Sequence, residues 1–201
     1  MAQLGFADLL TEADTANEQR QLAKATAHLP GTMEEALPFY RRMIERHHAA
    51  MLAAEIDEAM RIREEAHQLA AKLNGGMTGI IGRDDAPGCI LERESAAAPG
   101  SFPLWGQAGD FAVTVGAMRV RVEMRGMFGI GSTSCLFPGF YARAVERDRP
   151  FLSETGFRRF LGVSGQMTPG LTPEAFARTV IAAYVDRELK GRLKAIEPRY
   201  R

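Results

Sequence analysis

Apolar residues follow a helical spacing through a long segment in the first half of the chain. Between residues 37 and 73 they recur at every third or fourth position, and only His48 and Glu55 interrupt the stripe. Asn74-Gly75-Gly76 follows, a sequence typical of a helix C-terminus. The pattern predicts one helix from Phe39 to Leu73, about 50 Å long.

Helix start and stop signals precede this segment. No Gly or Pro occurs from Phe6 to Leu29, which predicts a first helix, and Pro30-Gly31 ends it. Thr32 can then accept from first-turn amides while Glu35 reaches back in a capping box. Because Pro38 lies too deep for a short first turn, a kink or a new helix start is expected there.

The predicted helix from Phe39 to Leu73 is longer than a domain of this size is wide, so its apolar stripe needs a partner. An antiparallel hairpin with the first helix covers part of the stripe, and a second copy of the chain can cover the rest. The residues assigned to this partner interface are Ile44, Met51 and Ile62.

A strand-type alternation follows a segment rich in Gly and Pro. Residues 77–109 predict loops, in which Trp105 fills an edge of the core rather than forming a recognition platform. Two alternating runs joined by Gly116-Ala117 then predict a β-hairpin. Its apolar side consists of Phe111, Val113, Val115, Met118, Val120, Val122 and Met124. This side needs cover from helices or from further strands between residues 77 and 100.

Shorter helices are expected in the last third of the chain. They run from Pro138 to Asp148, from Ser153 to about Gly162, and from Thr172-Pro173-Glu174 to about Lys194. Together the elements predict an α+β fold. Residues 1–76 form a long helical hairpin or arm, and residues 77–201 form a loop-rich α+β domain with a β-hairpin and a C-terminal helix, the two packed as one unit.

The composition is that of a folded, cytoplasmic protein. With 46% hydrophobic and 25% charged residues, a chain of 201 residues can bury a core. No apolar run approaches the roughly 18 residues that span a bilayer, and residues 1–10 lack the basic region of a secretory signal. Cys89 and Cys135 form no CxxC pair, so we expect reduced thiols, no zinc site and no cofactor.

The charge is unevenly distributed although the net charge is zero. Residues 1–73 have 8 Lys+Arg against 12 Asp+Glu, residues 74–109 have 2 against 4, and residues 110–201 have 15 against 9. These counts give −4, −2 and +6. In the basic part 13 of the 15 cations are arginine, which suits forked recognition of phosphate or carboxylate. The alternative is that the basic part packs against the acidic helices of the same chain.

The histidine pattern does not favour a metal site. Glu45 and His48, and again Glu64 and His67, repeat the Glu-x-x-His spacing of di-metal helical bundles. Such bundles take these pairs from different helices, whereas both pairs here fall on one predicted helix with about 28 Å of rise between them. His47 and His48 are therefore expected to be packing or surface residues.

The glycine-rich segment from Gly126 to Cys135 is the remaining candidate for chemistry. It lacks the Gly-Lys-Ser/Thr ending of a phosphate loop, so a tight turn is favoured over a nucleotide site. A nucleophilic Cys135 would need a histidine base, and all four histidines lie in the predicted N-terminal helices. Beside Leu136 and Phe137, Cys135 is expected to be a small core residue.

Arginines supply the most specific candidate site. The residues assigned to phosphate or nucleic-acid binding are Arg119, Arg121, Arg125, Arg158 and Arg159. The first three share the polar side of the predicted hairpin, because residues two apart on a strand point the same way. Charges on exposed strands also serve to prevent edge-to-edge aggregation, which is the structural alternative. No recognised nucleic-acid-binding motif accompanies them.

Two segments carry a resemblance to known sequences. Residues 149–162 (RPFLSETGFRRFLG) and 189–200 (LKGRLKAIEPRY) look like parts of uncharacterised bacterial proteins carried on plasmids and other mobile elements. The two segments cover about an eighth of the chain. The resemblance implies no fold, activity or site residues. It implies a setting in which small accessory proteins act by binding host or element machinery.

These observations favour a non-enzymatic accessory protein that binds a macromolecular partner. A protein partner, or self-association through the long helix, is the first expectation, and nucleic acid bound by the basic C-terminal half is the second. The remaining alternative is an enzyme of unrecognised type built around the segment from Gly126 to Cys135. No membrane partner is expected.

Overall fold

The computed structural model describes residues 17, 20–21, 23–129, 132, 138–163 and 167–201 of the chain. Helices come first in the described chain, four consecutive strands then form one antiparallel sheet, and a further helix follows, so the predicted α+β class is confirmed. Most of the predicted first helix, from Phe6 to Leu29, lies outside the described residues. Among the helices that are described, none is long and apolar enough to cross a bilayer.

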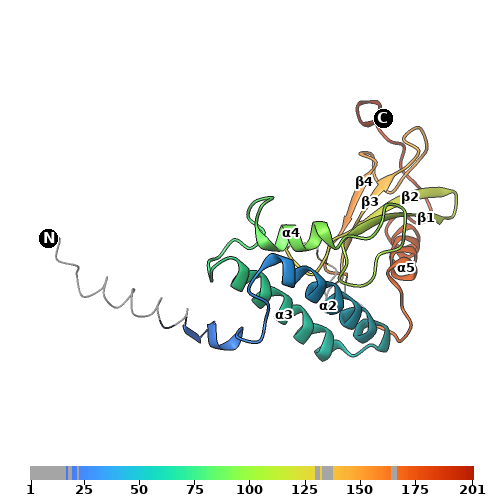
Figure 1. Ribbon diagram of the computed structural model, residues 1–201. Helices are drawn as coiled ribbons and strands as arrows, with labels where there is room; N and C mark the ends of the chain where they lie inside the picture. The colour runs from blue at the N-terminus through green and yellow to red at the C-terminus, as the bar shows by residue number, and fades with distance from the viewer. Residues whose placement is uncertain (1–16, 18–19, 22, 130–131, 133–137, 164–166) are drawn as a thin grey trace, which may run out of the picture.

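The predicted long helix is two helices. α2 (Met33–Ala53) and α3 (Ile56–Leu73) lie side by side as a hairpin (Figure 1). The break falls at Ala54, whose left-handed backbone (φ 59°) ends α2 without the Gly or Asn that usually marks such a position. The prediction of one helix was wrong. Helices in proteins are stabilised mainly by packing of their apolar side, and the two halves of the stripe pack on each other only when the chain turns back between them.

The start of α2 agrees with the capping prediction. The Thr32 side chain accepts a hydrogen bond from the Glu35 amide at 3.4 Å, and the Thr32 hydroxyl lies 3.1 Å from the Glu35 carboxylate. α2 continues through Pro38, so the new start predicted there is wrong. Pro38 has no backbone N–H, so α2 lacks one of its backbone hydrogen bonds there. The buried side chains of Tyr40 and Met43 stabilise this part of the helix by packing in the core.

A short helix appears where only loops were predicted. α4 (Pro87–Glu94) begins with proline in its first turn and buries Leu91 against the α2/α3 hairpin. Gly88 permits α4 to pack closely on the preceding loop, because a Cβ there would lie 2.7 Å from the Ile80 carbonyl oxygen. Trp105 is fully buried and donates its ring N–H to the Leu171 carbonyl at 2.7 Å, as expected of a core residue.

The predicted β-hairpin is confirmed. β1 (Gly109–Val115) pairs antiparallel with β2 (Met118–Met124), and Gly116 occupies the turn with φ 57°. β3 (Phe140–Ala144) and β4 (Phe157–Phe160) extend the sheet in the order β1-β2-β3-β4.

The helices predicted over residues 138–148 and from Ser153 are both wrong. These segments form β3 and β4, because alternate side chains such as Phe140 and Ala142 enter the core while their neighbours stay outside. Ser153 stabilises a turn rather than a helix, since its hydroxyl donates to the Phe157 carbonyl at 2.7 Å.

The last helix begins where it was predicted and ends early. α5 (Pro173–Arg187) is capped by Thr172, which accepts from the Ala175 amide at 3.2 Å. Left-handed backbone at Lys190 and Gly191 then turns the chain, so the helix does not reach Lys194. A short 3-10 helix, η1 (Pro198–Tyr200), follows near the C-terminus.

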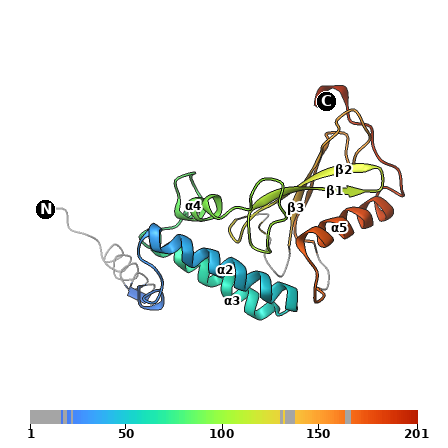
Figure 2. The same ribbon diagram turned by 45° about the vertical axis from the view of Figure 1, so that its right-hand side comes forward.

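The helices cover one side of the sheet. Figure 2 shows α5 along β1 and β2, with the α2/α3 hairpin extending from the same side. Side chains from the hairpin, the sheet and α5 share one core cluster that includes Met51, Trp105, Val120, Phe140 and Phe176. A second cluster fills the space between the hairpin and α4. The opposite side of the sheet carries the candidate site.

Candidate nucleic-acid interface

Alternation along β2 separates an apolar side of the sheet from a basic one. Val120 and Val122 are buried, whereas the alternating residues Arg119 and Arg121 are exposed. Strand pairing aligns Arg121 with Arg143 of β3, which places Arg143 on the same outer side.

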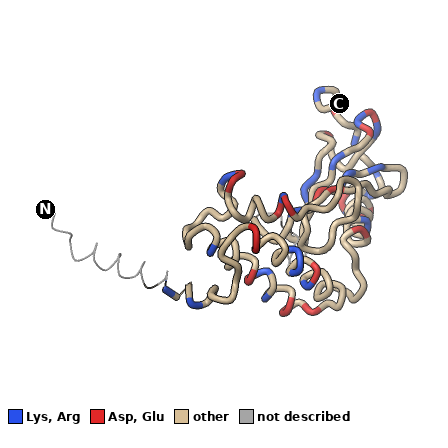
Figure 3. The backbone as a smooth tube through the Cα atoms, in the orientation of Figure 1, with Lys and Arg blue, Asp and Glu red and all other residues tan. Residues whose placement is uncertain are grey.

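The next pair of strands continues this surface. Tyr141 lies opposite Arg159, and Arg143 lies opposite Phe157. The resulting outer surface, here termed the arginine face, consists of Arg119, Arg121, Arg125, Arg143, Arg159, Tyr141, Phe157, Asp110 and Glu123. Five arginines against two carboxylates give it a net charge of +3. Figure 3 shows basic positions gathered along the strands.

Two carboxylates partly neutralise the arginine face. Asp110 accepts from Arg121 at 2.9 Å, while Glu123 pairs with Arg125 at 3.1 Å and with Arg143 at 3.7 Å. Like charges directly across a strand pair, as at Arg121 and Arg143, are destabilising.

Two arginines of the face have no acidic partner. In the part of the chain that the structure describes, no carboxylate lies within 4.0 Å of the guanidinium of Arg119 or Arg159. Arg159 instead lies over aromatic rings, 5.6 Å from the centroid of Tyr141 and 5.8 Å from that of Phe157. Their uncompensated charges are available to an anionic ligand.

Four of the five predicted arginines lie on one side of the sheet. Arg119, Arg121, Arg125 and Arg159 lie on the arginine face, whereas Arg158 points to the other side of the sheet. There its guanidinium lies 4.5 Å from the ring centroid of Tyr184 in α5. The assignment of Arg158 to the same surface is therefore wrong, because adjacent residues on a strand face opposite ways.

Three members of the arginine face were not predicted as site residues from the sequence. Arg143, Tyr141 and Phe157 fall in segments that were predicted to be helical. The signal that identifies them is the alternation within residues 140–144 (FYARA), where every second residue is buried. That run is short enough to suit either a strand or a helix, so the sequence left it ambiguous.

The three residues assigned to a partner interface lie in the interior. Ile44, Met51 and Ile62 are 3%, 0% and 1% exposed, packed within the cores that the hairpin forms with itself, with α4 and with the sheet. A second chain could reach them only if the hairpin opened. Self-association stays a prediction, but these side chains do not provide a surface for it in the folded chain.

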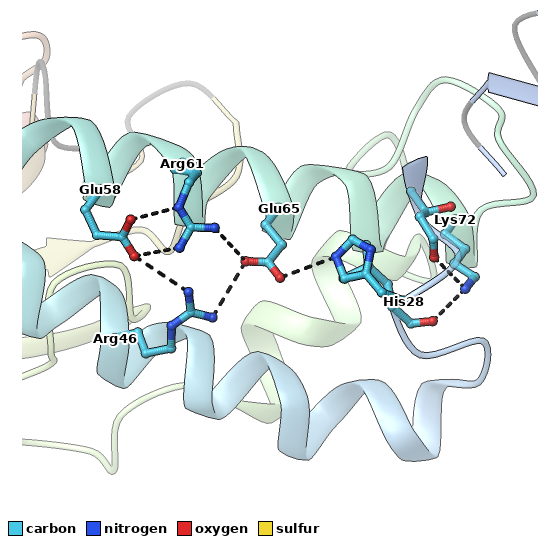
Figure 4. Close-up of polar contacts among 8 residues, drawn as sticks. His28, Arg46, Glu58, Arg61, Glu65 and Lys72 are labelled. Atoms are coloured by element: carbon cyan, nitrogen blue, oxygen red, sulfur yellow. Dashed lines mark hydrogen bonds and ion pairs between the residues drawn. The ribbon is translucent and has the colours of Figure 1, made fainter. Parts of the chain in front are cut away.

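Acidic residues of the hairpin are paired locally. Glu58 bonds to Arg61 and lies 3.6 Å from Arg46, and Glu65 lies 3.7 Å from both Arg46 and His28 (Figure 4). The basic C-terminal part was expected, as an alternative, to pack against these acidic helices. Glu58 and Glu65 instead pair with cations of the N-terminal part.

The histidines act as structural residues. His47 Nδ1 lies 3.1 Å from the Trp105 carbonyl oxygen, and His48 Nδ1 accepts from the Trp105 amide at 3.1 Å. Burial lowers the pKa of His47 to about 4 and also lowers the pKa of His48. His67 Nδ1 contacts the Arg63 carbonyl at 2.9 Å. The described residues contain no group of three or more His, Cys, Asp or Glu side chains placed to hold a metal.

The glycine-rich segment is only partly described. Cys135 and its neighbours lie outside the described residues. The segment begins against α4, where the Glu92 carboxylate accepts from the Phe128 amide at 3.0 Å. A Cβ on Gly126 would lie 2.5 Å from that carboxylate, so Gly126 is needed for close packing. Burial raises the pKa of the Cys89 thiol, which disfavours a reactive thiolate on α4.

Comparison with known proteins gives two bacterial relatives. Both are Escherichia coli proteins named Protein KlcB. One is 38% identical over 165 residues, covering 76% of this chain and 39% of the relative. The other is 39% identical over 132 residues, covering 63% of this chain and 28% of the relative. The chain thus spans less than half the length of these curated relatives, whose name states no activity.

Other comparisons give no match. No protein-family model matches the chain, and no solved structure is similar to it. The resemblance to bacterial proteins is confirmed at the level of these relatives.

Proposed function

We propose that this chain is a binding protein that holds nucleic acid on its arginine face. The observation that carries the proposal is the grouping of five arginines on one side of the sheet, four in β2, β3 and β4 and Arg125 directly after β2, against two carboxylates. Arginine suits phosphate because its guanidinium is always charged and presents its donors as a planar fork. A phosphate backbone requires the repeated, closely spaced cations that this side of the sheet provides.

A protein partner, the first expectation from the sequence, is the competing proposal. The stripe expected to bind such a partner is interior in α2 and α3, which removes the argument for it. An acidic protein surface could still bind the arginine face through the same charges. Carriage on plasmids or other mobile elements is part of the proposal, supported by the resemblance of residues 149–162 and 189–200.

The dependence of affinity on salt tests the proposal. Arg119→Ala with Arg159→Ala removes the two arginines that lack acidic partners and should lower the slope of log affinity against log salt by about two. Fluorescence anisotropy of a labelled oligonucleotide gives this slope. Arg42→Ala with Arg83→Ala removes the same charge from the helical part and should leave the slope unchanged.

Two results would contradict nucleic-acid binding. One is a wild-type protein that binds neither DNA nor RNA at low salt. The other is binding that falls equally in both double variants, which would mean that only overall charge matters. Binding to polyglutamate without binding to nucleic acid would support an acidic protein as the partner instead.

A further inference from the structure

Two aromatic rings occupy the β3–β4 side of the arginine face. Tyr141 of β3 and Phe157 of β4 are half-buried, with ring centroids 6.0 Å apart and planes 25° apart. Guanidinium groups lie over them. The guanidinium carbon (Cζ) of Arg143 lies 4.6 Å from the ring centroid of Phe157, and that of Arg125 lies 5.8 Å from the ring centroid of Tyr141. Aromatic rings and planar guanidinium groups therefore alternate across the outer side of these strands.

Phosphate binding alone does not account for these rings. Cations with sufficient reach are enough for a phosphodiester, and a ring offers such an anion no favourable contact. A solvated strand surface does not require aromatic residues either, because polar side chains avoid exposing apolar area to water. A nucleobase, in contrast, presents a flat π-face that stacks on aromatic rings and on guanidinium planes.

We infer that the ligand of the arginine face is a single strand whose bases stack on Tyr141 and Phe157. The inference rests on the proposed function and adds the form of nucleic acid. In a duplex the bases are stacked inside and only the backbone meets a flat sheet, so the rings would have no partner. On a single strand the bases can turn toward β3 and β4 while Arg119 and Arg121 of β2 contact the backbone.

The spacing of the strands allows the backbone of a single strand to lie over β2 while its bases lie over β3 and β4. Residues two apart on β2 are about 7 Å apart, and neighbouring strands are about 4.8 Å apart. The arginines of β2 thus form a row beside the aromatic positions of β3 and β4. One extended strand lying across the sheet can place its backbone over the first row and its bases over the second.

A comparison of three ligands at low salt tests the inference on the wild-type protein. The ligands are a labelled single strand of about 12 nucleotides, an abasic strand of the same length and charge, and the corresponding duplex. We expect the strand with bases to bind at least about tenfold tighter than the abasic strand. Equal affinity for both would overturn base stacking while leaving phosphate binding intact. Failure to bind any of the three would overturn the proposed function itself.

Substitution of the rings gives a second test. Tyr141→Leu with Phe157→Leu should reduce the preference for bases over the abasic strand to nearly none, with the salt slope unchanged because no charge is lost. Phe39→Leu is the matched control and should leave the preference for bases unchanged. Phe39 also lies under an arginine, with the guanidinium carbon of Arg42 5.7 Å from its ring centroid, but it belongs to helix α2 and not to the sheet. Retention of the full preference by the double-leucine variant would contradict stacking on these rings.

A conservative variant separates binding from folding. Tyr141→Phe keeps the ring and should keep the base preference, whereas Tyr141→Leu should lose part of it. If the double-leucine variant is unfolded by circular dichroism, these single variants and the three-ligand comparison still decide the question. Loss of the preference in Tyr141→Phe would mean that the hydroxyl, and not the ring face, makes the contact.

Discussion

At the scale of single residues, adjacent histidines make opposite contacts with one loop residue. His47 lies against the Trp105 carbonyl while His48 accepts from the Trp105 amide. His48 can accept only when its Nδ1 carries no proton, so the pair holds the buried tryptophan loop best in its neutral state. Gly106 follows in a left-handed conformation, and a Cβ there would lie 2.8 Å from His47 Nδ1.

These histidines make stability depend on pH. The folded pKa of His47, about 4, lies below its ordinary value of 6.5, so the unfolded chain takes up the proton first as pH falls. Its contribution is therefore complete above pH 6.5 and declines as the pH falls toward 4.

We expect His47 to account for about 2 kcal/mol of stability lost between about pH 7.5 and about pH 5. Urea unfolding of the wild type and of His47→Gln at both pH values measures the difference. The same loss of stability in His47→Gln as in the wild type would contradict this assignment.

At the scale of elements, the sequence predicted best where local chemistry decides the outcome. The Thr32 and Thr172 caps, the start of α5 and the Gly116 turn depend on residues within a few positions, and all are confirmed. The break at Ala54 depends on contacts between α2 and α3, which no local signal marks. β3 and β4 were missed because runs of four or five residues fit a helix as well as a strand until their pairing is known.

Unknown strand pairing also limited what the sequence could predict about the candidate site. Arg119 and Arg121 could be grouped because both lie on one predicted strand. Arg143, Tyr141 and Phe157 join them only through the pairing of three strands, which spacing along the chain cannot give. The sequence thus predicted some residues of the arginine face and missed Arg143, Tyr141 and Phe157.

The break between α2 and α3 offers a direct test of backbone strain. Ala54 adopts φ 59°, a conformation that costs an L-residue about 1–2 kcal/mol and costs glycine little. Ala54→Gly should raise the free energy of unfolding by up to about 1 kcal/mol, after the added entropy of the unfolded chain is counted.

Ala53→Gly is the matched control, since Ala53 is exposed at the helical end of α2. It should lower the free energy of unfolding by about 0.5–1 kcal/mol. Urea denaturation of both variants measures the two effects. Equal destabilisation by both substitutions would show that Ala54 is not in the left-handed conformation.

At the scale of the whole molecule, the hairpin and the sheet share a core. Ala50, Met51 and Ala59 of the hairpin pack in the same cluster as Val120 of β2 and Ile181 of α5. The stripe expected to bind a second copy is thus occupied within the chain. The arginine face remains outside this core, so substitutions on it are expected to change binding more than stability.

Paired methionine substitutions test this arrangement. Met51 is fully buried, and Met51→Ala should lower the free energy of unfolding by about 2–5 kcal/mol, because it leaves a cavity in the shared core. Met77 is 66% exposed, and Met77→Ala should change the free energy of unfolding by less than about 0.5 kcal/mol. Urea unfolding measures both. A folded, fully stable Met51→Ala protein with altered oligomeric state would instead place Met51 at a surface between copies.

The burial of the single tryptophan has an optical consequence. Trp105 is 0% exposed, contacts Phe176 of α5 with ring centroids 5.4 Å apart, and lies in the core between the hairpin and the sheet. In an apolar surrounding an indole emits at shorter wavelength than it does in water, so the chain carries one intrinsic reporter of its folded core. The arginine face lies on the opposite side of the sheet from this ring. Tryptophan emission therefore reports whether a variant is folded independently of whether its binding surface is occupied.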